Sequence, residues 1–178
     1  MRYIPNILSY FRILLIPFFI WEMLQNNGWA AALVLAVSGL TDMLDGFLAR
    51  RYNWISEWGK VLDPLADKLT QVAVCIVMFA KMREYWFFFA VLLLKEILML
   101  IIGAYLVKHK IKIEGAKWFG KILTILFYFT MVLIVFITGM PSWAVITLLS
   151  LTTFFALIAT MLYIPEFKKY NREIKDYK

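Results

Sequence analysis

The amino-acid sequence predicts an all-α integral membrane protein with six transmembrane helices. Three observations carry this prediction: 63% of the 178 residues are hydrophobic, only 17% are charged, and the apolar residues form long stretches separated by short polar clusters. A soluble domain averages about 45–50% apolar and about 25% charged residues, so the composition excludes that class. The single cysteine, Cys75, lies inside an apolar stretch, which excludes a disulfide-bonded secreted domain.

Six apolar stretches are each long enough to cross the roughly 30 Å apolar core of a bilayer. They cover residues 4–25, 29–50, 62–82, 86–107, 119–138 and 143–163. Polar and turn-forming residues separate consecutive stretches, and tryptophans lie near their ends, as is typical of membrane interfaces. We therefore expect a single membrane domain over residues 1–178, which ends in a basic cytoplasmic tail at residues 166–178.

Each stretch has a distinguishing feature. The first contains Arg12, which argues against a cleaved signal peptide and favours a mature helix. The second and third carry acidic residues close to the polar connection between them, residues 53–59. The fourth contains the charged pair Lys95 and Glu96, the fifth has Lys121 near its start, and the sixth has no charged residue before the basic tail.

The distribution of positive charge predicts the orientation. Of the 19 Lys and Arg residues, 16 lie in the N-terminal segment, in the connections after the second and fourth stretches, in the tail, or in the parts of the stretches next to these segments. With six spans these segments share one side of the membrane, so the positive-inside rule places both termini in the cytoplasm. We expect a multi-pass protein of the cell (plasma) membrane whose basic tail contacts anionic membrane lipids, with no nucleic-acid partner.

Four aspartates lie where a bilayer disfavours charge: Asp42 and Asp45 in the second stretch, and Asp63 and Asp67 in the third. Each pair has the spacing of a single helix face. A charged residue at the centre of a helix costs about 2.5–3.5 kcal/mol to insert, so four of them need compensation. The short connection predicts that the two helices are antiparallel neighbours whose aspartates face a common polar cavity. Carboxylate oxygens in such a cavity suit Mg²⁺ or Mn²⁺.

Small residues accompany the aspartates. Gly46, Ala49 and Gly59 leave room for a bulky ligand to approach the backbone. Pro64 follows Asp63 directly, so we expect Asp63 to cap the N-terminus of the third helix. In the alternative interpretation, the aspartates form interfacial salt bridges with nearby basic residues, and the small residues only pack helices together.

The residues so far form the pattern Asp42-x2-Asp45-Gly46-x2-Ala49-Arg50-x8-Gly59-x3-Asp63-x3-Asp67. This pattern resembles the signature of the CDP-alcohol phosphotransferases, membrane enzymes that make phospholipids from CDP-diacylglycerol. The resemblance implies a homodimer with six transmembrane helices per subunit and a cytoplasm-facing site for two divalent ions. It implies that Asp42, Asp45, Asp63 and Asp67 bind the metal ions and that Asp67 is also the catalytic base. It further implies that Gly46, Ala49, Arg50 and Gly59 bind CDP-diacylglycerol.

The acceptor is predicted from further resemblances. Residues 4–12 and 62–68 are similar to the corresponding segments of bacterial phosphatidylglycerophosphate synthases, which implies transfer of the phosphatidyl group to glycerol 3-phosphate. Asn6 and Arg12 lie in the first of these segments and are expected to contact CDP-diacylglycerol. The acceptor phosphate needs positive charge, and the candidates to supply it are Lys95, Lys117 and Lys121.

Two departures from the synthase pattern keep other acceptors open. The synthases commonly carry Arg-Glu where this chain has Lys95-Glu96, and Leu123 replaces a lysine of their Gly-Lys-x-Lys-Thr segment. Phosphatidylglycerol, the acceptor of six-helix cardiolipin synthases, and a polar alcohol such as inositol phosphate are alternatives. Lys95 could also simply pair with Glu96 inside the bundle. A divalent cation transporter is the non-enzyme alternative, but the third stretch is apolar beyond Gln71, which disfavours an ion pathway.

Overall fold

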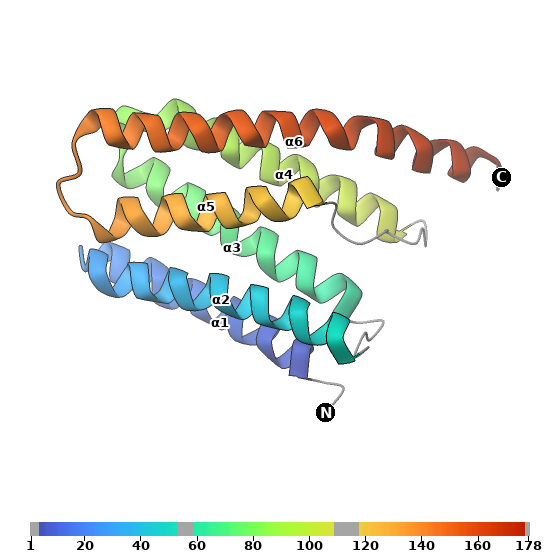
Figure 1. Cartoon of the computed structure of the whole chain (residues 1–178), viewed down its shortest axis with the longest axis horizontal. Helices are drawn as coiled ribbons and strands as arrows, with labels where there is room; N and C mark the ends of the chain where they lie inside the picture. The colour runs from blue at the N-terminus through green and yellow to red at the C-terminus, as the bar shows by residue number, and fades with distance from the viewer. Residues whose placement is uncertain (1–3, 53–58, 109–117, 177–178) are drawn as a thin grey trace.

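The computed structural model describes residues 4–52, 59–108 and 118–176. These residues form six α-helices and one short 3-10 turn, without a β-strand (Figure 1). The helices are α1 (Ile4–Leu24), α2 (Gly28–Tyr52), α3 (Gly59–Lys81), α4 (Trp86–Lys108), α5 (Trp118–Phe136) and α6 (Ser142–Asp176), and η1 (Arg83–Tyr85) precedes α4. The predicted all-helical fold is confirmed.

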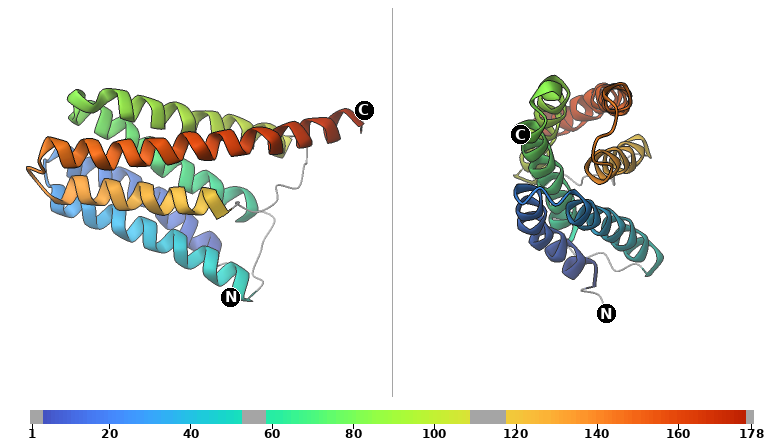
Figure 2. Two further views of the ribbon diagram at one scale, coloured as in Figure 1. Left: turned by 45° about the horizontal axis from the view of Figure 1, so that its top comes forward. Right: turned by 90° about the vertical axis from the view of Figure 1, so that its left-hand side faces the viewer.

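The helices alternate in direction along the bundle (Figure 1). The start of α1 and the end of α6 therefore lie at the same end of the bundle. The C-terminal ends of α2 and α4 and the N-terminal ends of α3 and α5 lie at this end too. Each helix packs closely against two others, in the pairs α1–α2, α1–α3, α3–α4, α4–α6, α5–α6 and α2–α5 (Figure 2).

The position of α1 differs from the expected packing. We expected α2 and α3 to be direct neighbours, but α1 packs closely against both of them, and α2–α3 is not among the closely packed pairs. The short connection fixes that the two helices are antiparallel, but it leaves room for a third helix between them. The acidic faces of α2 and α3 therefore meet across α1.

In the described part of the chain, four segments are long and apolar enough to cross a membrane by length and composition: Ile7–Leu24, Gly28–Asp45, Arg83–Tyr105 and Ser142–Tyr163. The apolar part of α5, Gly120–Phe136, is shorter. The first half of α3 carries several charged residues. Large apolar side chains such as Trp21, Leu94 and Phe154 are exposed on the outside of the bundle, where a bilayer would cover them. These features agree with an integral membrane protein.

α6 is longer than the sixth predicted span. It continues to Asp176, so the backbone of most of the segment that we expected as a basic tail is helical. Its 35 residues correspond to a length of about 50 Å, well above the roughly 30 Å apolar core of a bilayer. The last turns of α6 accordingly project beyond the other helices (Figure 1).

The prediction that Asp63 caps α3 is wrong. The helix begins earlier, at Gly59, and Pro64 lies inside it. A proline so near the start of a helix removes only one backbone hydrogen bond, so the preceding residues can still be helical. The Asp63 carboxylate instead accepts a hydrogen bond from the Ser9 hydroxyl of α1.

Gly28 marks a close approach between α2 and α5. A Cβ atom at Gly28 would lie 2.6 Å from the backbone oxygen of Val135, which cannot rotate away. We therefore expect Gly28→Ala to separate these helices and lower the free energy of unfolding by about 1–3 kcal/mol. Thermal unfolding of the detergent-solubilised protein measures this effect. Gly103→Ala is the matched control, because a Cβ atom there meets no atom within 4 Å. Equal melting temperatures for the two variants would contradict the close approach.

Candidate active site

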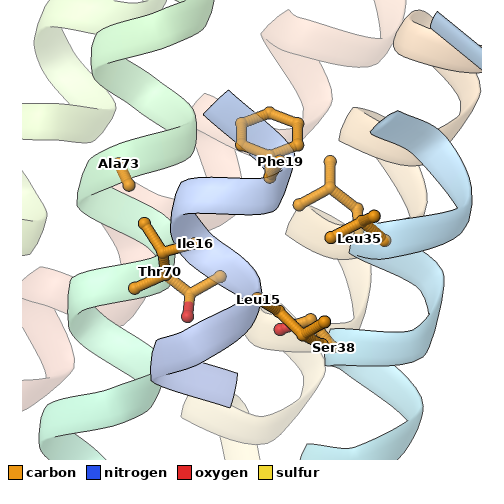
Figure 3. Close-up of a pocket in the computed structure, with 8 residues that line it drawn as sticks. Leu15, Ile16, Phe19, Leu35, Ser38, Thr70 and Ala73 are labelled. Atoms are coloured by element: carbon orange, nitrogen blue, oxygen red, sulfur yellow. The ribbon is translucent and has the colours of Figure 1, made fainter. Parts of the chain in front are cut away.

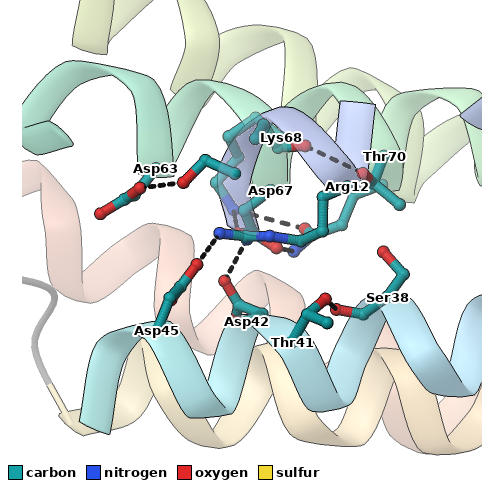
Figure 4. Close-up of polar contacts among 12 residues, drawn as sticks. Arg12, Ser38, Thr41, Asp42, Asp45, Asp63, Asp67, Lys68 and Thr70 are labelled. Carbon is teal, nitrogen blue, oxygen red and sulfur yellow. Dashed lines mark hydrogen bonds and ion pairs between the residues drawn. The ribbon is translucent and has the colours of Figure 1, made fainter. Parts of the chain in front are cut away.

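The four predicted site aspartates lie on both sides of α1. Asp42 and Asp45 project from α2 on one side, and Asp63 and Asp67 project from α3 on the other (Figure 4). Arg12 of α1 lies between the two pairs (Figure 4). The cluster lies toward the end of the bundle that holds both ends of the chain.

Arg12 joins α1 to α2 through two ion pairs. Its Nη1 atom pairs with Asp42 Oδ1, and its Nη2 atom pairs with Asp45 Oδ2. The Arg12 side chain is completely buried, Asp45 is almost completely buried, and Asp42 is partly exposed. Charges removed from water in this way are tolerated only when they are paired, and the planar guanidinium group can neutralise two carboxylates at once.

The two aspartates of α3 have their own polar partners. Ser9 donates a hydrogen bond to Asp63. Gln71, one turn further along α3, donates from Nε2 to Asp67 Oδ1 over 2.8 Å, and the Lys68 Nζ atom lies 3.5 Å from Asp67 Oδ2. Since each Asp67 oxygen has a separate neighbour, the orientation of this carboxylate is defined.

A second charged cluster joins α3 to α4. Glu96 is buried on α4, and its Oε2 atom lies 3.0 Å from the Nζ atom of Lys68. Its other oxygen accepts a hydrogen bond from Lys95, which is also buried. Lys68 therefore connects Glu96 and Lys95 to Asp67. The pairing of Lys95 with Glu96 is one of the two alternatives that the sequence left open.

A small apolar pocket adjoins the polar cluster. Its lining residues come from α1, α2 and α3: Leu15, Ile16, Phe19, Val34, Leu35, Ser38, Thr70 and Ala73 (Figure 3). Ser38 lies one turn before Asp42, and Thr70 lies about one turn after Asp67. The pocket is therefore one turn deeper in the bundle than the carboxylates.

The donor chemistry of the cluster fits a divalent ion, although its side chains are arranged around an arginine. Among the described residues, no three Asp, Glu, His or Cys side chains are close enough together to hold a metal ion. The positive charge between Asp42 and Asp45 comes from Arg12. Carboxylate oxygens that attract one cation are also the ligands that Mg²⁺ and Mn²⁺ prefer.

Comparison with known proteins identifies the family. The sequence profile of the CDP-alcohol phosphatidyltransferases matches residues 2–164. The chain belongs to this family. The resemblance inferred from the aspartate pattern is thereby confirmed, and the matched region contains all four aspartates of the site, Arg12 and the Lys68–Glu96–Lys95 cluster.

Two curated relatives of this chain carry different names. The cardiolipin synthase (CMP-forming) of Streptomyces coelicolor is 39% identical over 129 residues, which cover 68% of this chain and 59% of that protein. The CDP-diacylglycerol–glycerol-3-phosphate 3-phosphatidyltransferase of Escherichia coli K12 is 35% identical over 128 residues, which cover 68% of this chain and 70% of that protein. The chain thus spans less than two thirds of the Streptomyces protein.

The other predicted site residues of this phosphatidyltransferase are only partly described. Asn6, Gly46, Ala49 and Arg50 lie on the helical backbone of α1 and α2, but their side chains lie outside the described part of the structure. Lys117 also lies outside the described residues. Of the remaining two, Gly59 is buried at the start of α3, and Lys121 is exposed near the start of α5.

Sequence reasoning missed two residues of the site region. Glu96 received no role of its own, because nothing in the sequence indicated that it also pairs with Lys68 on another helix. Tyr128 of α5 lies within the apolar fifth stretch, which predicts a membrane-spanning residue without a role in the site. It is buried and close enough to Arg12, Asp42 and Asp67 to interact with them electrostatically. A lone tyrosine in an apolar stretch gives no signal that distinguishes a site residue from a core residue.

Proposed function

We propose that the protein transfers the phosphatidyl group of CDP-diacylglycerol to the hydroxyl of glycerol 3-phosphate, which yields phosphatidylglycerophosphate and CMP. The observation that carries this proposal is the aspartate cluster on α2 and α3 around Arg12, inside the region matched by the family profile. The name of the Escherichia coli relative supports both the donor and the acceptor.

In the proposed reaction, the oxygen of the acceptor hydroxyl attacks the phosphorus that is linked to diacylglycerol. A new P–O bond forms, the P–O bond to CMP breaks, and CMP leaves with the bonding electron pair. Asp67 accepts the proton of the acceptor hydroxyl. Its hydrogen bond from Gln71 holds the carboxylate in place, and the ammonium group of Lys68 lies 3.5 Å from its other oxygen.

The cluster also has to balance the negative charge of the diphosphate. Asp42, Asp45, Asp63 and Asp67 would hold two divalent ions, Mg²⁺ or Mn²⁺, which neutralise the diphosphate and stabilise departing CMP when bound. Because Arg12 pairs with Asp42 and Asp45, it competes with an ion for these carboxylates and supplies positive charge of its own. Arg12 is also proposed to contact CDP-diacylglycerol, together with Asn6, Gly46, Ala49, Arg50 and Gly59.

The proposed acceptor site draws on the basic residues Lys95, Lys117 and Lys121. Lys95 lies in the buried cluster that reaches Asp67 through Lys68, which would bring an acceptor phosphate near the base. We further propose a homodimer in the plasma membrane, with both termini in the cytoplasm and the basic C-terminal segment against anionic lipids.

One observation favours a second acceptor, phosphatidylglycerol, which would make the protein a cardiolipin synthase. Glu96 neutralises part of the charge of Lys95 and Lys68, so less positive charge is left for a free phosphate group. The Streptomyces relative that carries this name is 39% identical.

The acceptor is tested by measuring CMP release. We expect the purified protein to release CMP from CDP-diacylglycerol with Mg²⁺ only when glycerol 3-phosphate is added. Phosphatidylglycerol is supplied in a parallel reaction. Release with phosphatidylglycerol alone would replace the proposed acceptor by the second one. An absence of release with both acceptors would contradict the proposed reaction.

The proposed metal ligands are tested by titration. Asp63→Asn retains an oxygen that can accept the Ser9 hydrogen bond but removes a negative charge from the cluster. We expect the Mg²⁺ concentration for half-maximal activity to rise by about tenfold or more. Glu84→Gln, in η1 at the opposite end of the bundle, is the control and should not change the titration. An unchanged titration for Asp63→Asn would remove Asp63 from the set of ligands.

A further inference from the structure

Tyr128 of α5 extends toward the aspartate cluster. Its ring packs on Gly39 of α2, where an added Cβ atom would lie 3.2 Å from the Cγ atom and 3.3 Å from the Cδ1 atom of the ring. These distances are shorter than ordinary carbon contacts, so even a methyl side chain at position 39 would displace the ring. Gly39 therefore provides the space that lets Tyr128 extend between α5 and α2.

Among the described residues, none makes a hydrogen bond of normal geometry with the buried Tyr128 hydroxyl. It lies beside the Ser38 hydroxyl, yet neither group makes a hydrogen bond of normal geometry through its side-chain oxygen to any described residue. Both residues are more than nine-tenths buried. Buried hydroxyl groups are nearly always hydrogen-bonded, because an unpaired one has lost its water without compensation. Two such groups side by side indicate a position where a ligand or a water molecule supplies the missing partner.

The surroundings of the hydroxyl identify the chemistry of that partner. Tyr128 interacts electrostatically with Asp67, Asp42 and Arg12, so its hydroxyl lies in the same charged region as the group proposed as the base. Ser38 lines the apolar pocket one turn deeper than the carboxylates (Figure 3). Of the two phosphates in CDP-diacylglycerol, the one bonded to the lipid is both closer to the apolar part of the molecule and the one attacked. A neutral phenol can donate a hydrogen bond to this phosphate without adding a buried charge.

We propose that Tyr128 is a further substrate-binding residue, whose hydroxyl donates a hydrogen bond to an oxygen of the lipid-linked phosphate. The absence of a side chain at Gly39 leaves the space that the Tyr128 ring needs to reach this position. This inference rests on the proposed function, since it takes CDP-diacylglycerol as the donor. The bond strengthens as negative charge builds up on the phosphate oxygens during transfer, so its main effect is on turnover.

Tyr128→Phe tests the inference, because it removes the hydroxyl and keeps the ring on Gly39. Without substrate, we expect the melting temperature of the detergent-solubilised variant to equal or exceed that of the wild type, since no hydrogen bond is lost. We expect kcat to fall about 10- to 100-fold with the KM for the acceptor unchanged, and the rise in melting temperature on adding CDP-diacylglycerol to shrink. Tyr85→Phe is the matched control, because Tyr85 is also buried but lies in η1 at the opposite end of the bundle.

The possible outcomes separate this inference from the proposed function. A wild type that neither releases CMP nor gains stability with CDP-diacylglycerol would overturn the proposed function itself. An active wild type with a Tyr128→Phe variant of equal kcat would overturn only the role of Tyr128. A variant that melts below the wild type without substrate would show that the hydroxyl bonds to protein or to a structural water, which also overturns the inference. Gly39→Ala, which displaces the ring, should reproduce the loss of kcat.

Discussion

Asp67→Asn is expected to lower the rate of CMP release by at least about 10²- to 10⁴-fold, which is the usual contribution of a positioned general base. An asparagine amide cannot accept the proton of the acceptor hydroxyl. Its oxygen can still accept the hydrogen bond that Gln71 donates to Asp67 Oδ1, so the local structure of α3 should persist. The measurement is the steady-state rate with saturating CDP-diacylglycerol, acceptor and Mg²⁺.

Substrate binding distinguishes a lost base from a damaged site. We expect Asp67→Asn to keep most of the thermal stabilisation that CDP-diacylglycerol gives the wild type, because Arg12 and the other three aspartates are unchanged. Glu84→Gln, which alters a carboxylate at the far end of the bundle, should keep the full rate. A near-normal rate for Asp67→Asn would remove Asp67 as the base.

Arg12→Met should have the largest effect on stability. Arg12 is completely buried and forms ion pairs with both Asp42 and Asp45. Methionine has a similar length but no charge, so two carboxylates would remain close together without the guanidinium group that pairs with both. Removing one partner of a buried ion pair typically costs about 3–5 kcal/mol. The midpoint of thermal unfolding in detergent, measured without divalent ions, should therefore fall well below that of the wild type.

A second substitution tests the cause of this loss. If the instability of Arg12→Met comes from uncompensated negative charge, then adding Asp45→Asn should restore part of the melting temperature. Mg²⁺ should also stabilise Arg12→Met more than the wild type, because Arg12 no longer competes for the carboxylates. If Arg12→Met melts at the wild-type temperature without Mg²⁺, the ion pairs do not stabilise the bundle.

The sequence determined the fold class and indicated the acidic residues of the candidate site. Apolar stretches of about 20 residues are typical of membrane spans, and the apolar core of a bilayer requires every backbone polar group to be paired, which favours helices. The spacing of Asp42 with Asp45 and of Asp63 with Asp67 placed each pair on a single helix face, because a helix has a fixed period. The pattern that these residues form also indicated the family, which the profile match confirmed.

Element boundaries were less well determined. Pro64 suggested a helix start that the structure places earlier, at Gly59, because one missing hydrogen bond near a helix end is tolerated. Likewise, the charged segment after the sixth span was expected as a tail, although α6 continues as a helix to Asp176. In both places the helical backbone extends beyond the boundary that the side-chain pattern predicted, before Asp63 in α3 and after residue 163 in α6.

Only the tertiary structure decided which residues meet. Helical periodicity assigns a residue to a face of its own helix, but it does not determine which other helix that face contacts. The packing of α1 against both α2 and α3 brought Arg12 to Asp42 and Asp45. The same limit applied to Glu96, whose partner Lys68 lies on another helix, and to Tyr128, which reaches the site through the space at Gly39. The sequence alone indicated the acidic groups of the candidate site, while the positive charges and hydroxyls around them depend on how the six helices pack.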